Sequence, residues 1–282
     1  MADLAKRQRW RYAKNIIEGT SALTDGASRD HDSFVESKAK RNLMARLTSI
    51  EMRSQHAQEV SERELYETFI WAGTHLYASD EDEHFFVRKL ISIPFNLFTS
   101  KAMEFGISTW VWVSRARPSV HTRLFAEIAK NWGWTIRRGK GLFTSHLKYD
   151  RSTYPSNFSI HNPFSRAMEY KPTDMHRRAK HEKYVQETFA PHLFILRYLR
   201  QHIQQCGAVD SHTIFSIYRL TMASLNASKH ISKHPLAREG RLHLVLLGFG
   251  LVRDGQLSMK MQTALQLSTY RFALSWYARP PM

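Results

Sequence analysis

Residues 118–139 read PSVHTRLFAEIAKNWGWTIRRG, and their spacing decides the fold class of the chain. Val120, Leu124, Ile128 and Trp132 recur at four-residue intervals, which places them on one stripe of an α-helix. A proline in the first turn and a glycine just past the last turn are typical helix boundaries. The stretch therefore predicts an amphipathic helix with one buried face.

Comparable periodicities predict helices along most of the chain. The expected helices cover residues 38–56, 61–77, 85–98, 101–116, 174–207, 210–227, 235–252 and 258–278. Ser61 is expected to cap the second of these, Pro94 to break or kink the third, and Pro191 to interrupt the fifth. Because no β-hairpin signature interrupts the order, the sequence predicts an all-α chain, either a bundle or an α-solenoid of antiparallel helices.

Two segments differ from this helical pattern. Residues 1–37 are rich in Ser, Asp, Gly and Thr with little apolar periodicity, and they predict a mobile, basic and polar N-terminal arm. Residues 147–173 mix Pro, Ser, Asn and Tyr without a sustained period, which predicts a loop or insertion. The helical segment is therefore expected to span residues 38–282, with this insertion inside it.

Composition limits the class of protein. The chain has 282 residues, of which 43% are hydrophobic, and a single cysteine. That fraction is enough for a core, whereas one cysteine excludes an internal disulfide and favours a reducing, cytosolic or nuclear compartment. The longest nearly apolar run, residues 242–252, is too short to span a bilayer.

The formal net charge of +16 is uneven along the chain, with basic excess in residues 105–155 and 206–282 and acidic excess in residues 61–104. Such a distribution is compatible with binding to nucleic acid or to an anionic membrane surface, and equally with solvated helix faces. The residues proposed for contact with an anionic surface are Arg137, Arg138, Lys140, Arg177, Arg178, Lys180 and Lys183. Aromatic residues that flank basic ones could stack on bases, namely Trp110, Trp112, Trp132 and Trp134. The place of Trp110 and Trp132 on apolar stripes favours core packing instead.

No motif specifies an active site. Residues 133–141 only imitate a phosphate-binding loop, because Gly141 stands where the hydroxyl residue is needed. Gly248 and Gly250 lack the third glycine and the preceding strand of a dinucleotide fingerprint, so they are expected to permit close helix packing instead. The histidines show no zinc-ligand spacing, and Cys206 has no nucleophile context. We therefore expect no catalytic, cofactor-binding or metal-binding residue in the chain.

Four blocks of sequence nevertheless resemble, in order, the type III alpha phosphatidylinositol 4-kinases, in particular those of fungi. They are residues 109–146, 190–203, 234–252 and 270–281. The positions that carry the resemblance are Trp110, Trp112, Glu127, Ala129, Trp132, Thr135, Gly141, Leu142, Phe143, Pro191, His192, Arg241, Gly248, Trp276 and Pro280. Each block alone is only weakly specific for the family, and the resemblance depends on their order and spacing.

The resemblance implies a non-catalytic segment of an irregular, HEAT- or armadillo-like solenoid that lies upstream of the lipid-kinase domain. The whole enzyme would phosphorylate phosphatidylinositol at the 4-position, with ATP and magnesium as cofactors. The catalytic Asp-Arg-His-x-x-Asn and Asp-Phe-Gly motifs of the family are absent here, so no catalytic residue is carried over.

The resemblance also implies partners and a location. The expected partners are the rest of the kinase chain, a second copy, and adaptor or scaffold proteins at the plasma membrane, with anionic lipid as a further candidate. The expected location is cytoplasmic and peripheral at the plasma membrane. The alternative is a free-standing basic helical-repeat protein that binds nucleic acid or an anionic membrane, and we expect nucleic acid to be the less suitable ligand.

Overall fold

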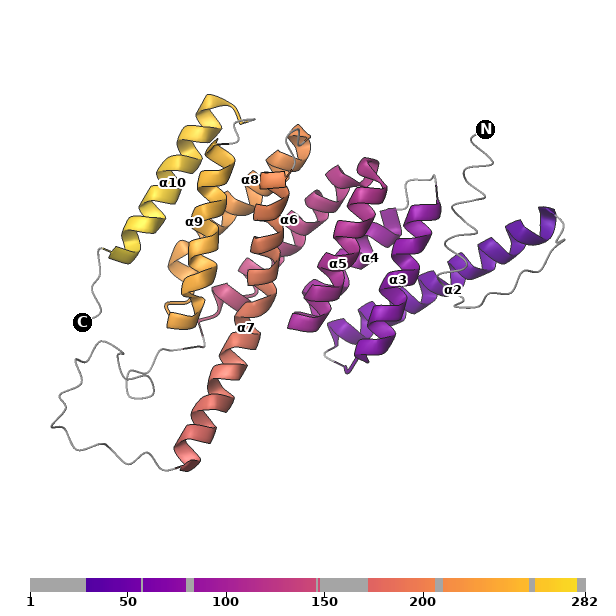
Figure 1. The fold of residues 1–282 in the computed structure, drawn as a ribbon, viewed down its shortest axis with the longest axis horizontal. Coiled ribbons are helices and arrows are strands. Elements are labelled where there is room, and N and C mark those ends of the chain that lie inside the picture. Colours follow the sequence, from indigo (N-terminus) through magenta and orange to yellow (C-terminus); the bar gives the residue numbers. More distant parts are fainter. Residues whose placement is uncertain are drawn as a thin grey trace. The chain divides into compact units, whose positions relative to one another are not determined.

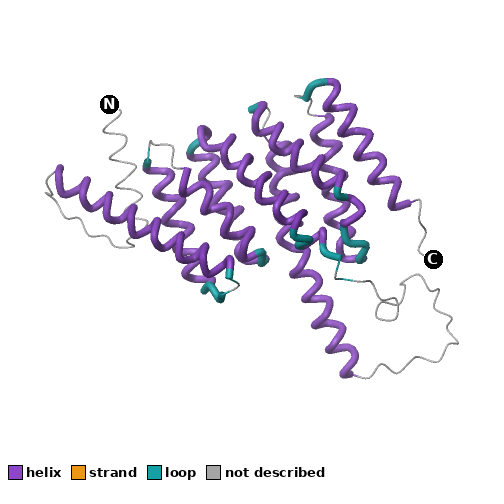
Figure 2. Tube along the Cα trace, turned by 180° about the vertical axis from the view of Figure 1, so that it is seen from behind, coloured by secondary structure: helices purple, strands orange, loops and turns teal. Residues whose placement is uncertain are grey.

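The computed structural model describes residues 29–56, 58–79, 84–145, 147, 172–205, 210–253 and 257–277, and throughout these ranges the regular elements are helices (Figure 2). The long helices are α2 (Arg29–Gln55), α3 (Glu62–Ala78), α4 (His84–Leu97), α5 (Ser100–Ala116), α6 (His121–Arg137), α7 (Pro172–Gln205), α8 (Ser211–Asn226), α9 (Arg238–Arg253) and α10 (Met259–Tyr277). Short 3-10 turns join them, namely η1 (Pro118–Val120), η2 (Gly141–Phe143), η3 (Ser228–His230) and η4 (Pro235–Ala237). The expectation of an all-α chain is confirmed.

The chain divides into two compact units. The first comprises residues 1–132 and 208–217, and the second comprises residues 133–207 and 218–282. The division falls within α6 and within α8, so each of these helices contributes to both units.

Helices of the first unit pack in two alternating layers (Figure 1). Helix α2 lies against α4 and α3 lies against α5, while neighbours in sequence also contact one another. Packing between helices two apart in the chain is how successive helix pairs of an α-solenoid stack. The first unit is therefore solenoid-like.

Aromatic side chains fill the core between these layers. Phe69, Phe86, Phe95 and Trp110 are fully buried. The rings of Phe95 and Trp110 stack with centroids 6.4 Å apart, and Trp110 Nε1 donates a hydrogen bond of 3.0 Å to the carbonyl of Leu90. Burying an indole without a partner for its N–H would be costly, so this bond fixes the position of Trp110.

A polar link between α2 and α4 is also buried. Glu51 accepts hydrogen bonds from Lys89 Nζ and, at 2.6 Å, from Ser92 Oγ. Burial opposes the charged form of Glu51, but the hydrogen bonds from Lys89 and Ser92 outweigh burial, and its pKa lies below the ordinary value. The ion pair therefore fixes which turn of α2 faces which turn of α4.

In the second unit α9 is the central helix. It packs against α7 on one side and α10 on another, and both η2 and η4 contact α7. Leu244, Leu247 and Leu251 of α9 are buried and recur at helical spacing, whereas Leu242 and Leu246 are exposed. The contact of α7 with α9, again two helices apart, repeats the packing of the first unit.

Close approach of α9 and α10 depends on Gly248. A Cβ at this position would lie 2.4 Å from Thr269 Oγ1 and 3.1 Å from its Cγ2, and Thr269 is fully buried. Gly250 has nothing within 4 Å of its would-be Cβ. The expectation of close packing is therefore confirmed for Gly248 and wrong for Gly250, because the two residues lie on different faces of α9.

Several expected boundaries differ from the structure. Helix α2 begins at Arg29, so residues 29–37 are helical rather than part of the expected arm. Residues 1–28 and most of the expected insertion, residues 148–171, lie outside the described residues. Ser61 occupies the N-cap of α3, but its side chain makes no capping hydrogen bond.

Pro191 lies inside α7, and the helix continues through it, so the expected interruption is wrong. The proline removes one backbone hydrogen bond, at a cost of about 3 kcal/mol. Burial of the residues around it outweighs that cost, because Phe189, Ile195 and Leu196 on either side are in the core.

Gly248→Ala is expected to lower the free energy of unfolding by about 1–3 kcal/mol, because the new methyl would overlap Thr269 in a core that cannot expand. Gly250→Ala is the matched control, and it should leave stability unchanged or raise it by up to about 1 kcal/mol through helix propensity. Urea unfolding followed by circular dichroism measures both changes. Equal effects of the two substitutions would contradict the proposed role of Gly248.

Candidate functional site: a buried histidine hub and a basic pocket

His192 of α7 connects three segments of the second unit. Its Nδ1 accepts a 3.0 Å hydrogen bond from the backbone N–H of Leu142 in η2, and its Nε2 lies 2.9 Å from Thr135 Oγ1 in α6. The ring of Phe143 meets the imidazole edge to face at 5.4 Å. We call His192, Thr135 and Leu142 the histidine hub.

Burial determines the protonation state of the His192 imidazole. His192 is fully buried, and desolvation lowers its pKa from 6.5 to about 3. The imidazole is therefore neutral at physiological pH. Since Nδ1 accepts from an amide, the proton must reside on Nε2, which donates to Thr135 Oγ1.

Leu142 also contacts the segment before α9 and α9 itself. Its carbonyl accepts a 2.7 Å hydrogen bond from the backbone N–H of Ser232, and its side chain lies where a Cβ on Gly240 would be, 2.6 Å from Leu142 Cδ2. Gly139 and Gly141 flank the turn before Leu142 with φ of 59° and 54°, a region that favours glycine. Both glycines therefore serve the geometry of this connection rather than phosphate binding.

The positions that carry the family resemblance are thus largely structural. Trp110, Trp132, Leu142, Phe143 and His192 are buried, and Trp112, with 38% of its surface exposed, packs over Gly73 and stacks on Tyr77. Core packing is confirmed for Trp110 and Trp132, so neither is available for stacking on bases.

The remaining positions of that set make local contacts. Glu127 pairs with Lys130 in α6 at 3.3 Å, and the partly buried Arg241 donates to the carbonyl of His234 at 3.5 Å. Burial, together with the charge of Arg238, lowers the pKa of Arg241. Trp276 and Pro280 have side chains outside the described residues.

The expected anionic-surface residues are only partly brought together. Arg138 and Lys140 both lie over the ring of Trp134, at 5.3 Å and 4.7 Å from its centroid. Burial, with the charge of Arg138 as a second cause, lowers the pKa of Lys140. Arg137, Lys180 and Lys183 are exposed, while the side chains of Arg177 and Arg178 lie outside the described residues. The predicted surface therefore contains one cation–aromatic cluster, Trp134, Arg138 and Lys140.

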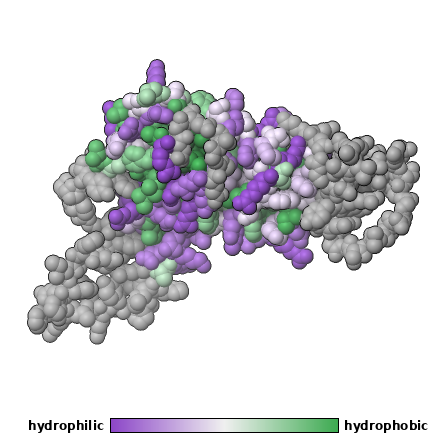
Figure 3. All heavy atoms as spheres, turned by 45° about the horizontal axis from the view of Figure 1, so that its top comes forward, coloured by the Kyte–Doolittle hydropathy of each residue, from purple (hydrophilic) through white to green (hydrophobic). Residues whose placement is uncertain are grey.

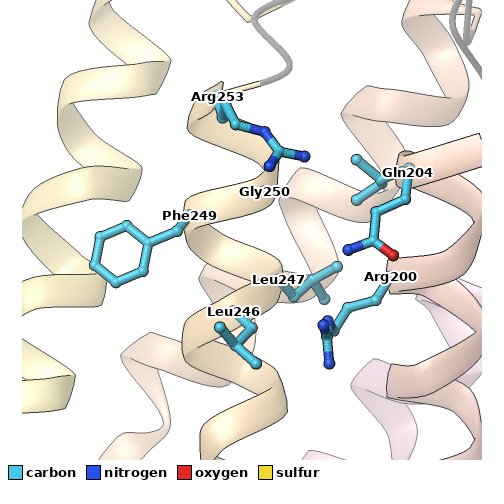
Figure 4. Close-up of a pocket in the computed structure, with 8 residues that line it drawn as sticks. Arg200, Gln204, Leu246, Leu247, Phe249, Gly250 and Arg253 are labelled. Atoms are coloured by element: carbon cyan, nitrogen blue, oxygen red, sulfur yellow. The ribbon is translucent and has the colours of Figure 1, made fainter.

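A pocket that sequence reasoning missed lies between the C-terminal halves of α7 and α9. It has a volume of about 270 Å³. Figure 4 shows Arg200, Gln204 and Arg253 pointing into the space between the two helices, with Leu247 between the levels of the Arg253 and Arg200 guanidinium groups. Among the described residues that line it there are two arginines and no carboxylate. We call it the basic pocket.

Arg200 is held in place by a chain of polar contacts. Its Nη1 donates to His243 Nδ1 at 2.7 Å, and His243 Nε2 lies 3.4 Å from a carboxylate oxygen of Glu239, which in turn pairs with Arg197. Burial and the neighbouring Arg200 lower the pKa of His243, so this imidazole is uncharged at neutral pH. The charge of Arg200 is thus directed toward the pocket by a neutral partner, an arrangement suited to binding an anion.

No group of three or more His, Cys, Asp or Glu side chains within the described ranges could hold a metal ion. A second pocket of about 380 Å³ lies between α2 and α3, where the guanidinium of Arg46 covers the ring of Trp71 at 4.9 Å. None of the described helices is both long and apolar enough to cross a bilayer.

Comparison with known proteins identifies the family. A family model described as the PI4-kinase N-terminal region matches residues 10–282. The chain belongs to the family of PI4-kinase N-terminal regions.

Among the curated relatives of this N-terminal region, phosphatidylinositol 4-kinase stt4 of Schizosaccharomyces pombe is 24% identical over 289 residues, covering 100% of the chain and 14% of the relative. Phosphatidylinositol 4-kinase STT4 of Saccharomyces cerevisiae is 26% identical, with 68% of the chain and 10% of the relative covered. Phosphatidylinositol 4-kinase alpha 1 of Arabidopsis thaliana is also 26% identical, with 69% and 9% covered. The chain therefore spans only 9% to 14% of the length of these relatives.

Replacing His192 by Gln should change how the stability of this PI4-kinase N-terminal region depends on pH. The unfolded chain binds a proton at His192 below pH 6.5, whereas the folded chain binds it only near pH 3, so stability falls as the pH is lowered through that window. The contribution is about 1.4 kcal/mol per pH unit. Urea unfolding between pH 6 and pH 4 should therefore show a shallower loss of stability for His192→Gln than for wild type.

Thr135→Val provides the control for that measurement. It removes the hydroxyl that accepts from His192 but keeps the buried imidazole, so it should lower stability while preserving the steep pH dependence. Parallel pH curves for wild type and His192→Gln would show that His192 does not fold in its neutral form.

Proposed function

We propose that this PI4-kinase N-terminal region is a non-catalytic helical scaffold segment of a phosphatidylinositol 4-kinase. The match of the family model to residues 10–282 carries the proposal, since it covers every residue that the structure describes. Two observations support a role in positioning the kinase domain. The helices stack on one another, and most positions that carry the resemblance lie in contacts that hold these helices together.

The parent enzyme would transfer the γ-phosphoryl group of ATP to the 4-hydroxyl of phosphatidylinositol, releasing ADP, with magnesium neutralising the phosphates. ATP and magnesium are proposed for that enzyme only, and no residue of this chain is assigned to bind them. The enzyme would work in the cytoplasm as a peripheral protein at the plasma membrane.

The proposed partners are the rest of the kinase chain, a second copy, and adaptor proteins at the plasma membrane. The outer face of α10 supports such contacts, because Leu267, Tyr270 and Leu274 are exposed and recur at helical spacing. An apolar stripe of this kind marks an interaction surface rather than a solvated one. The cluster of Trp134, Arg138 and Lys140 supports a weaker role in contact with anionic lipid.

A chimeric kinase tests the scaffold role. The stretch of S. pombe stt4 that matches this chain is replaced by the chain itself, and the purified chimera is assayed on phosphatidylinositol vesicles with Mg-ATP. We expect phosphatidylinositol 4-phosphate formation by the chimera and none by the isolated chain.

Two matched versions of the chimera make the assay specific. One lacks the stretch altogether, and the other carries Gly248→Ala, which disturbs the contact of α9 with α10. We expect both to lose activity or to aggregate, the deletion at least about tenfold. Full, stable activity of the deletion protein would contradict the scaffold role, and activity of the isolated chain would contradict its non-catalytic nature.

A further inference from the structure

The outer face of α9 carries an apolar ridge that its own packing does not use. Leu242 and Leu246 are 49% and 38% exposed, and Phe249 follows them at helical spacing. The ring of Phe249 contacts that of Tyr270 in α10, with centroids 5.2 Å apart. Figure 3 shows hydrophobic residues interspersed with hydrophilic ones on the side of the molecule where α9 and α10 lie.

Helix α9 therefore has apolar side chains on two faces. Leu244, Leu247 and Leu251 are buried against the neighbouring helices, while Leu242 and Leu246 lie on the other side. A surface helix needs only one apolar stripe to pack on its own core. The second stripe is a surface to which another amphipathic element can bind.

The basic pocket lies at the C-terminal end of this ridge. Leu246 and Phe249 line the pocket as well as the ridge, together with Arg200 and Arg253 (Figure 4). The ridge and the pocket are thus one continuous surface, apolar along α9 and positively charged at its end. We call it the α9 surface.

We propose that the α9 surface binds an amphipathic helix of a protein partner, whose apolar side chains pack on Leu242, Leu246 and Phe249 and whose acidic side chain enters the basic pocket. Helices that bind in grooves use apolar anchors at such spacings. A carboxylate can accept paired hydrogen bonds from arginine, and two arginines beside an apolar floor favour an anion on a short hydrocarbon stem.

The shape of the pocket favours a protein partner over a bilayer. A volume of about 270 Å³ between two helices admits one side chain. A bilayer presents a plane of headgroups, which responds to all positive charges near the surface and not to those in one recess. Arg238, exposed at the other end of α9, provides a charge on the same helix but outside the pocket.

Selection from a random library of 16-residue displayed peptides tests the proposal. The purified 282-residue chain is the target, and the double variant Arg200→Gln, Arg253→Gln is the counter-target. We expect enriched peptides with apolar residues at helical spacing and at least one Glu or Asp near one end. No enrichment over the counter-target, or enriched peptides without an acidic residue, would overturn the proposal.

The synthetic peptides that emerge are then measured by fluorescence anisotropy. We expect binding to weaken at least about tenfold for the double variant and for Leu246→Gln, since hydrogen bonds to charged groups and the apolar anchor both contribute. Arg238→Gln, the matched charge control, should change affinity less than about twofold. Equal losses of affinity from Arg238→Gln and from the double variant would show general electrostatic attraction and would contradict the proposed role of the basic pocket.

Binding to lipid vesicles tests the competing hypothesis that the basic pocket binds a lipid headgroup. The chain is sedimented with phosphatidylcholine vesicles that contain or lack phosphatidylserine. We expect no dependence of that binding on Arg200 and Arg253 beyond that seen with Arg238→Gln. Selective loss of vesicle binding in the double variant, with no acidic peptide selected, would assign the pocket to lipid instead. Circular dichroism of every variant confirms that folding is retained.

Discussion

One uncharged imidazole holds together the connection on which the second unit depends. His192 can accept from Leu142 and donate to Thr135 only as the neutral Nε2–H tautomer, and full burial maintains that state. A charged or rotated ring would leave a buried donor or acceptor without its bond. Because η2 then lies between α7 and Gly240 of α9, the fit of these helices follows from a single protonation state.

Most of the helical order could be predicted from the sequence, because amphipathic periodicity reports directly on which residues meet the core. The stripe of Val120, Leu124, Ile128 and Trp132 is buried in the structure. The early start of α2 was missed because residues 29–37 form a helix without an apolar stripe. Pro191 was misjudged because local sequence shows the lost hydrogen bond but not the surrounding burial that compensates for it.

Less of the candidate site than of the helical order could be predicted from the sequence. Resemblance to the family pointed to His192 and Leu142, but their roles as acceptor and donor became clear only when α6, α7 and η2 were seen together. The basic pocket had no sequence signal at all. Arg200 and Arg253 stand on different helices, far apart in the chain, and only the packing of α7 on α9 makes them neighbours. The net charge of the chain therefore does not locate the pocket.

The contact of Gly248 with Thr269 has a consequence for how this sequence can diverge. Neither position can enlarge alone, because the hydroxyl of Thr269 occupies the space that a side chain at 248 would need. An alanine at 248 becomes acceptable once residue 269 lacks that hydroxyl, as alanine or glycine does, and a larger residue at 269 requires glycine at 248 to persist. Across a set of homologues the two positions should therefore covary as a pair, and their joint substitution pattern would record the spacing of α9 and α10 in chains that have no structure.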